Sequence, residues 1–110
     1  MMYDGALRQM EAGKHAMANR DLEKQNACLQ RAQRIVLELI ACLDMEKGGE
    51  IAQNLLSLYS FVVDQLVQAN MRDEPEIIDQ CIQVLSELRE GWQSLDDALH
   101  ASPPDIAKAA

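Results

Sequence analysis

The chain has 110 residues, which is enough for one domain with a single core but too short for two. Its formal charge of -8 argues against binding to nucleic acid or to anionic membranes, because both need basic side chains that neutralise phosphates. A hydrophobic content of 48 % with only 4 % aromatic residues is too apolar for disorder and is typical of an aliphatic helical core.

Two helices are expected in the first part of the chain, over about residues 1–18 and 21–43. Between them, residues 19–21 form a short polar connection that contains good helix-capping side chains. In the first helix, three-four spacing relates Tyr3, Leu7, Met10, Lys14 and Met17. In the second, the helical period relates Leu22, Leu29, Ala32, Val36, Leu39, Ile40 and Leu43.

A turn over residues 44–49 and a third helix over about residues 50–70 are expected next. The turn contains Gly48 and Gly49, and glycine readily adopts the positive φ that often ends a helix. Glu50 then falls in the first turn of the third helix, where a carboxylate interacts favourably with the helix dipole. The residues expected to face the core are Ile51, Leu55, Leu58, Val62, Leu66 and Ala69.

The fourth expected helix covers about residues 74–99 and has the most regular pattern in the chain. Its apolar residues alternate steps of three and four, as in a coiled-coil seam: Ile78, Cys81, Leu85, Leu88, Trp92, Leu95 and Leu99. Residues 101–110 have no periodicity and are expected to be a flexible tail. Four long helices with short connections predict an all-α fold, an antiparallel up-down-up-down four-helix bundle in residues 1–100.

No catalytic or metal site is expected from the sequence. A di-iron bundle needs Glu-x-x-His pairs, and the nearest combinations, Glu11 with His15 and Asp97 with His100, lie on mostly polar faces without matching partners. The sequence also lacks a phosphate-binding loop and a nucleophile paired with a base. We therefore expect no enzyme activity, no metal, no cofactor and no small-molecule substrate.

The compartment is expected to be reducing and cytoplasmic. The three cysteines, at positions 28, 42 and 81, are odd in number and far apart, which disfavours a disulfide framework and a zinc site. The N-terminus has no secretory signal pattern, and the most apolar run, residues 35–43, is too short to span a membrane. Nothing in the sequence is expected to export or anchor the chain.

The apolar surplus beside the expected core stripes is the best candidate for a binding surface. Leu56, Val63 and Val67 lie to one side of the stripe on the third helix, with Tyr59 between the two sets. Cys28, Ile35 and Cys42 flank the stripe on the second helix. One interpretation is a groove that accepts amphipathic helices, with anchors Leu56, Tyr59, Val63 and Val67 and with Ile35 as a neighbour. The other is a wider core, or flanks covered by a further N-terminal segment.

Four segments of the sequence carry a family resemblance. The run from Leu43 to Tyr59, with its Gly-Gly-Glu-Ile-Ala-x-Asn-Leu string, closely resembles the signature of the FliS-type flagellin export chaperones. The opening Met2-Tyr3-Asp4-Gly5-Ala6, the string Gln68-Ala69-Asn70 and the run from Leu85 to Trp92 resemble further motifs of the family in the same order. The signature residues expected to be structural are Tyr3, Asp4, Gly5, Gly48, Gly49, Glu50, Asn54, Asn70 and Trp92.

The resemblance implies a specific function. It implies a chaperone in the bacterial cytosol that binds the disordered C-terminal segment of flagellin, prevents its premature polymerisation and supports its delivery to the flagellar type III export apparatus. Export gate components or a co-chaperone are further partners that it implies. Family members usually carry a short segment before the motif at residue 2, and that segment is thought to cover part of the client site. The alternative function is a self-associating helical scaffold without a flagellin client.

Overall fold

A computed structural model of the chain describes residues 2–101, with side chains described for residues 2–91. It contains four helices: α1 (Met2–Ala18), α2 (Leu22–Ala41), α3 (Met45–Arg72) and α4 (Pro75–Ala101). The expected tail lies outside the described residues except for Ala101, which ends α4. The same limit applies to the side chains of Trp92, Leu95 and Leu99, so their expected burial stays a prediction.

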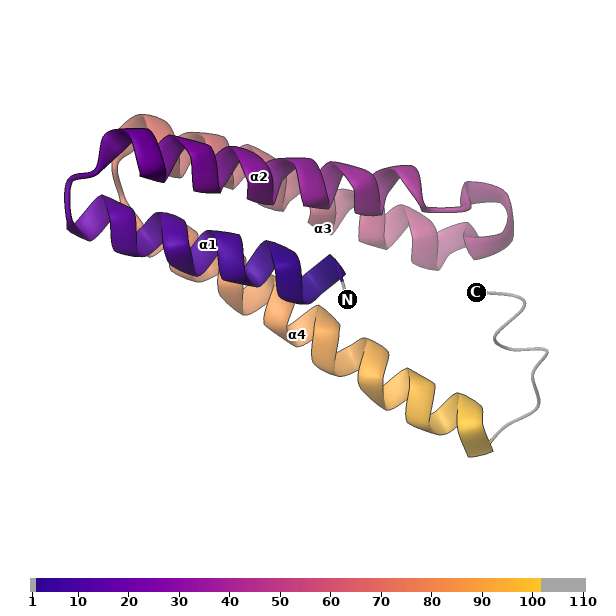
Figure 1. The fold of residues 1–110 in the computed structure, drawn as a ribbon. Helices are drawn as coiled ribbons and strands as arrows, with labels where there is room; N and C mark the ends of the chain where they lie inside the picture. The colour runs from indigo at the N-terminus through magenta and orange to yellow at the C-terminus, as the bar shows by residue number, and fades with distance from the viewer. Residues whose placement is uncertain (1, 102–110) are drawn as a thin grey trace.

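The helices form an antiparallel bundle (Figure 1). Each helix packs against its neighbours in the chain, and α4 returns to pack against α1, so the four helices form a closed ring of contacts. The contact between α1 and α2 is the most extensive. Short connections between successive long helices enforce this up-down-up-down order. The expected all-α four-helix bundle is therefore confirmed.

A three-four spacing of core residues runs through the bundle. On α3 the buried residues are not the expected set, because Ala52 and Tyr59 take the inward positions that had been assigned to Ile51 and Leu58, which are exposed. The resulting steps alternate between three and four, the repeat that keeps a seam facing its partner in left-handed helix packing. The buried residues on α1 are Tyr3, Ala6, Met10, Gly13, Ala16 and Met17, and those on α3 are Ala52, Leu55, Tyr59, Val62, Leu66 and Ala69.

The fourth helix follows its predicted seam as far as the side chains are described. Ile78, Cys81 and Leu85 are fully buried, while Leu88 is half-buried and packs against the core. Burial raises the pKa of the Cys81 thiol to about 12, because the thiolate would lose its hydration. Cys81 is therefore a protonated core residue at neutral pH.

The connection between α2 and α3 is shorter than expected. The third helix begins at Met45 rather than near Glu50, because the Asp44 side chain accepts hydrogen bonds from the backbone N–H groups of Glu46 and Lys47. Gly49 then interrupts the helix with φ 52° and ψ -128°. The glycine pair thus kinks α3 after its first turn and does not precede it.

Substitution of the two glycines tests this kink. Gly49→Ala is expected to lower the free energy of unfolding by about 1–2 kcal/mol, because its positive φ strains any residue with a Cβ. Gly48→Ala is also expected to destabilise, since its Cβ would lie 2.6 Å from the Cβ of Ala52. Gly91→Ala on α4 is the control, because its Cβ meets nothing within 4 Å and it should gain up to about 1 kcal/mol. If Gly48→Ala and Gly49→Ala both unfold at the same urea concentration as the wild type, the kink is contradicted.

A polar cluster joins the start of α2 to the end of α3. The buried Gln25 side chain donates from Nε2 to Oδ1 of Asn70 at 3.1 Å and to Oδ1 of Asp73 at 2.8 Å. Asn70 in turn donates from Nδ2 to Oδ1 of Asn26 at 2.8 Å. Asp73 has φ 55° at the C-cap of α3, which starts the turn into α4. These bonds fix which side of α3 faces α2.

Candidate functional site

Three of the five residues expected to anchor a client lie together. Leu56, Val63 and Val67 fall within about 40° of one another around α3 at 100° per residue. Val67 is 36 % exposed, while Leu56 and Val63 are half-buried and Val63 packs against the core. This flank of α3 is on the same side as Asn70, which bonds to Asn26, so it borders α2.

Tyr59 is not part of that flank. Its side chain is only 3 % exposed, and its hydroxyl forms a hydrogen bond with the hydroxyl of Tyr3 from α1. The two rings are tilted by 47° with their centroids 6.4 Å apart. Because the inward stripe of α3 follows a three-four repeat, Tyr59 enters the core between Leu55 and Val62. It therefore cannot serve as a solvent-facing anchor in this structure.

Ile35 also lies elsewhere. Its Cδ1 atom is 3.5 Å from the position that a Cβ on Gly5 would occupy, so it packs on the α1 side of α2. Cys28 marks the same side, because its Cβ is 3.5 Å from the corresponding position at Gly13. The expected flank of α2 is thus largely an α1 contact, and it does not continue the surface formed by Leu56, Val63 and Val67.

Leu37 is the residue on α2 that does extend this surface. The hydrogen bond between Asn26 and Asn70 places these two residues at the same height along the bundle. Because α2 and α3 are antiparallel, Leu37, eleven residues after Asn26, lies at the height of position 59 on α3, which is between Leu56 and Val63. It lies about 160° around α2 from Ile35, and it is 51 % exposed. We call Leu37, Leu56, Val63 and Val67 the α2–α3 seam.

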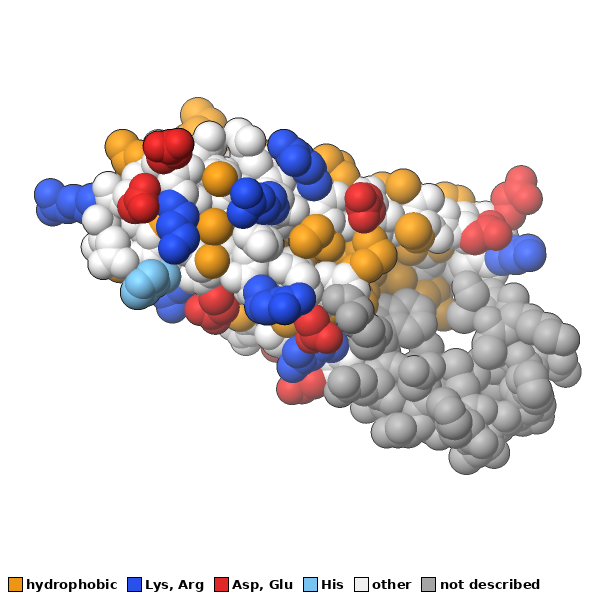
Figure 2. Space-filling model, in the orientation of Figure 1, with side chains coloured by type: hydrophobic (Ala, Val, Ile, Leu, Met, Phe, Trp, Pro, Cys, Tyr) orange, Lys and Arg blue, Asp and Glu red, His pale blue; other side chains and the backbone are white. Residues whose placement is uncertain are grey.

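The sequence contains a signal that Leu37 belongs to this surface, although the pattern analysis does not select it. It is an apolar residue about 100° from Val36, the centre of the predicted stripe, on the side opposite to Cys28 and Ile35. Only the structure shows which side of α2 faces α1 and which borders α3. Figure 2 shows further apolar side chains gathered over the C-terminal half of α2, beyond the N-terminal end of α1.

The signature residues at the start of α1 connect this helix to the rest of the bundle. Tyr3 reaches Tyr59, Gly5 lies beside Ile35 of α2, and Asp4 pairs with Arg89 of α4 at 2.6 Å. The hydrogen bond from Arg89 lowers the pKa of Asp4. The stabilisation from this lowered pKa is present above about pH 3.8 and is lost as the pH falls below that value.

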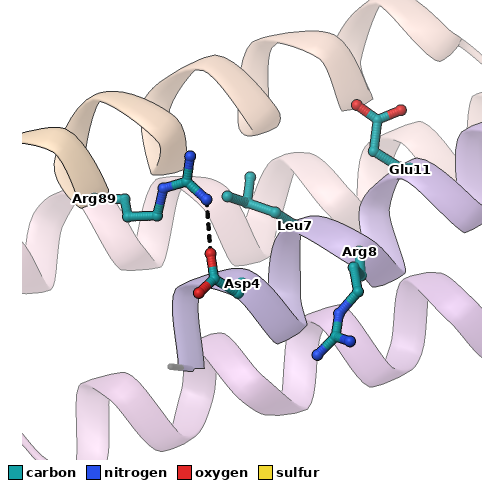
Figure 3. Close-up of a pocket in the computed structure, with 5 residues that line it drawn as sticks. All are labelled: Asp4, Leu7, Arg8, Glu11 and Arg89. Atoms are coloured by element: carbon teal, nitrogen blue, oxygen red, sulfur yellow. Dashed lines mark hydrogen bonds and ion pairs between the residues drawn. The ribbon is translucent and has the colours of Figure 1, made fainter.

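A shallow hollow between α1 and α4 surrounds this ion pair. Figure 3 shows the hollow, in which Arg89 points across to Asp4 while Arg8 and Glu11 follow along α1. Among the described residues that line the hollow, Leu7 is apolar and the other four are charged. A second pair, Lys14 with Asp79 at 2.7 Å, joins the same two helices.

The other signature residues have structural positions. Asn70 belongs to the polar cluster and Gly48 and Gly49 form the kink, whereas Glu50 and Asn54 are exposed on α3. Trp92 lies in α4, and its side chain is outside the described part.

The described residues contain no group of three His, Cys, Asp or Glu side chains placed to hold a metal ion. Within the same part of the chain, no helix is both long and apolar enough to cross a membrane.

Comparison with known proteins adds a family assignment. Residues 1–99 match the profile of a family described as Flagellar protein FliS. The chain is 35 % identical over 100 residues to the flagellar secretion chaperone FliS of Vibrio cholerae, covering 91 % of this chain and 74 % of that protein. The corresponding protein of Campylobacter jejuni is 37 % identical over 95 residues, covering 86 % and 74 %. That of Salmonella typhimurium is 34 % identical over 96 residues, covering 86 % and 71 %.

Proposed function

Because this chain belongs to the family of the flagellar protein FliS, we propose that it is a flagellar export chaperone whose client is flagellin. It binds the disordered C-terminal segment of flagellin, keeps that segment from polymerising and supports its delivery to the flagellar type III export apparatus. It acts in the bacterial cytosol, where the client is held before export. Export gate components or a co-chaperone are its further partners. The related proteins are named as chaperones, which is consistent with a binding role without catalysis.

The α2–α3 seam is the observation that supports this proposal. Leu37 on α2 and Val67 on α3 expose apolar surface, and the half-buried Leu56 and Val63 lie beside them on α3. An amphipathic helix can bury its apolar face against such an apolar strip, with anchors that recur every three or four residues. A segment that folds only upon binding loses conformational entropy, so it needs an extended apolar contact of this kind.

The experiment is a calorimetric titration with a flagellin C-terminal peptide. Val67→Asp and Leu37→Asp are expected to weaken binding at least about tenfold, equivalent to about 1.4 kcal/mol, because each places a charge against the apolar face of the client. Both residues are more exposed than Val63, where a charge would also disturb the core. The variants should therefore keep the helical circular dichroism of the wild type.

Ser57→Asp is the charge-matched control for this titration. Ser57 is exposed on α3 and lies about 80–100° away from Val67 and Leu56, so the added charge should leave the affinity within about twofold of the wild type. If the two seam variants stay folded and bind the peptide as the wild type does, the α2–α3 seam is not the client site. Absence of binding by the wild type would reject flagellin as the client.

A further inference from the structure

A second apolar surface lies on the opposite flank of α3. Leu58 is 39 % exposed and Phe61 is 43 % exposed, and they lie about 140–160° around the helix from Val63. The Sγ atom of Cys81 approaches the backbone oxygen of Val62 at 3.8 Å, which shows that this side of α3 borders α4. A single helix bound to the α2–α3 seam would leave this flank uncovered.

The neighbouring helix completes the surface with its own apolar side chains. The contact between Cys81 and Val62 places these two residues at the same height along the bundle. Because α3 and α4 are antiparallel, Val84, three residues after Cys81, lies at the height of position 59 on α3, which is between Leu58 and Phe61. Asp79 and Arg89 pair with α1 on one side of α4, and Val84 and Leu88 lie on the other side. Both are half-buried. We call Leu58, Phe61, Val84 and Leu88 the α3–α4 seam.

The part of the chain that contains α3 and the first half of α4 is acidic. Residues 44–91 contain three Lys or Arg, at positions 47, 72 and 89, and ten Asp or Glu, at positions 44, 46, 50, 64, 73, 74, 76, 79, 87 and 90. Residues 1–43 are nearly balanced, with six Lys or Arg at positions 8, 14, 20, 24, 31 and 34 and five Asp or Glu at positions 4, 11, 21, 23 and 38. Figure 2 shows Lys and Arg side chains spread over the face that carries α1 and α2.

Two carboxylates stand directly beside the apolar residues. Asp64 lies one turn from Phe61 on α3, and Glu87 lies one turn from Val84 on α4; both are exposed. The nearest Arg of α4, Arg89, points the other way and pairs with Asp4. An apolar strip bordered by unbalanced carboxylates favours a partner whose apolar face is flanked by positive charge.

We propose that the α3–α4 seam is a second docking surface, which accepts an amphipathic helix with Lys or Arg along both edges of its apolar face. Leu58, Phe61, Val84 and Leu88 contact the apolar face, and Asp64 and Glu87 meet the basic edges. This docking surface is separate from the α2–α3 seam, because the two lie on opposite flanks of α3.

The probe is a synthetic amphipathic peptide of about 18 residues, about 27 Å long as a helix, made of Leu and Lys. Its partner is a peptide with the same Leu pattern and Glu in place of Lys. The Leu/Lys peptide is expected to bind the full chain in fluorescence anisotropy with an affinity that falls as salt is raised, while the Leu/Glu peptide does not bind measurably. Equal binding of both peptides would overturn the proposal.

Phe61→Asp separates seam docking from diffuse attraction. The substitution adds a negative charge, so diffuse attraction between the chain and the Leu/Lys peptide would become stronger. Docking in the seam predicts the opposite, a loss of at least about tenfold, because the peptide loses an aromatic contact and meets a charge on its apolar face. The charge-matched Ser60→Asp, about 100° away on the same helix, should bind at least as tightly as the wild type.

Three further results complete the test. If Phe61→Asp loses its helical signal, Phe61→Ala serves in its place, and it too should weaken binding without any change in charge. Unchanged or stronger binding by a folded Phe61 variant would overturn the proposal. A dimer of the free protein that Phe61→Asp converts to a monomer would also overturn it, because a second copy of the chain would then cover the seam. None of these measurements involves flagellin, so their outcome is independent of the proposed client.

Discussion

Leu85→Ala is expected to lower the free energy of unfolding by about 2–5 kcal/mol, the usual cost of removing a large side chain from a packed core. Leu85 is fully buried on α4, and the core cluster around it draws residues from all four helices. The truncation therefore removes apolar contacts and leaves a cavity that the neighbouring helices fill only in part. Urea unfolding followed by circular dichroism measures the loss.

Leu22→Ala is the matched control for Leu85→Ala. Leu22 is the first residue of α2 and is exposed, so the same truncation should change the stability by no more than about 0.5 kcal/mol. If Leu85→Ala lowers the free energy of unfolding by less than about 0.5 kcal/mol, the stripe of Ile78, Cys81 and Leu85 on α4 is not part of the core.

Gly13→Ala and Gly5→Ala are expected to differ in stability by about 1–3 kcal/mol, with Gly13→Ala the less stable. Both glycines lie in α1 at its contact with α2, and both variants gain the same helix propensity. A Cβ on Gly13 would lie 2.7 Å from Cδ2 and 3.0 Å from Cγ of Leu29, which is fully buried, so the packing around Leu29 would have to shift. A Cβ on Gly5 makes an ordinary contact at 3.5 Å.

Thermal unfolding of the two glycine variants tests how closely α1 and α2 approach. Gly5→Ala should unfold at or above the midpoint of the wild type, and Gly13→Ala should unfold below that of Gly5→Ala. If the two variants have equal unfolding midpoints, the distance between α1 and α2 at Gly13 is larger than in this structure.

The helices were predictable because local patterns determine them. The polar connection at residues 19–21 separates two long apolar-periodic segments, and α1 ends directly before it. The third helix is predicted to end at about residue 70 and ends at Arg72. The start of α3 differs from its predicted position because the Gly48-Gly49 pattern predicts a turn, while Asp44 caps the helix four residues before Gly48. A capping carboxylate and a kinking glycine give overlapping signals over so short a stretch.

The orientation of α3 depends on packing and could not be obtained from hydrophobicity alone. Ile51 and Leu58 are more hydrophobic than Ala52 and Tyr59, so a helical wheel places them inward. The bundle instead follows a three-four repeat, and the hydroxyl of Tyr59 finds a partner in Tyr3 across 56 residues of sequence. Such a pairing has no local signature.

The candidate binding surface was predictable only in part for the same reason. Leu56, Val63 and Val67 share a flank because of helical spacing alone, which the sequence reveals. The choice between Ile35 and Leu37 as their neighbour depends on the side of α2 that faces α1, and the contacts at Gly5 and Gly13 decide it.

The most direct measurement of the proposed function is the polymerisation of purified flagellin, followed by light scattering, with and without this protein. A chaperone that holds the C-terminal segment should suppress filament growth in proportion to its concentration and stop it near one chaperone per flagellin. Val67→Asp should suppress growth less than Ser57→Asp at the same concentration. Growth at the same rate with and without the wild-type protein would contradict the proposed function.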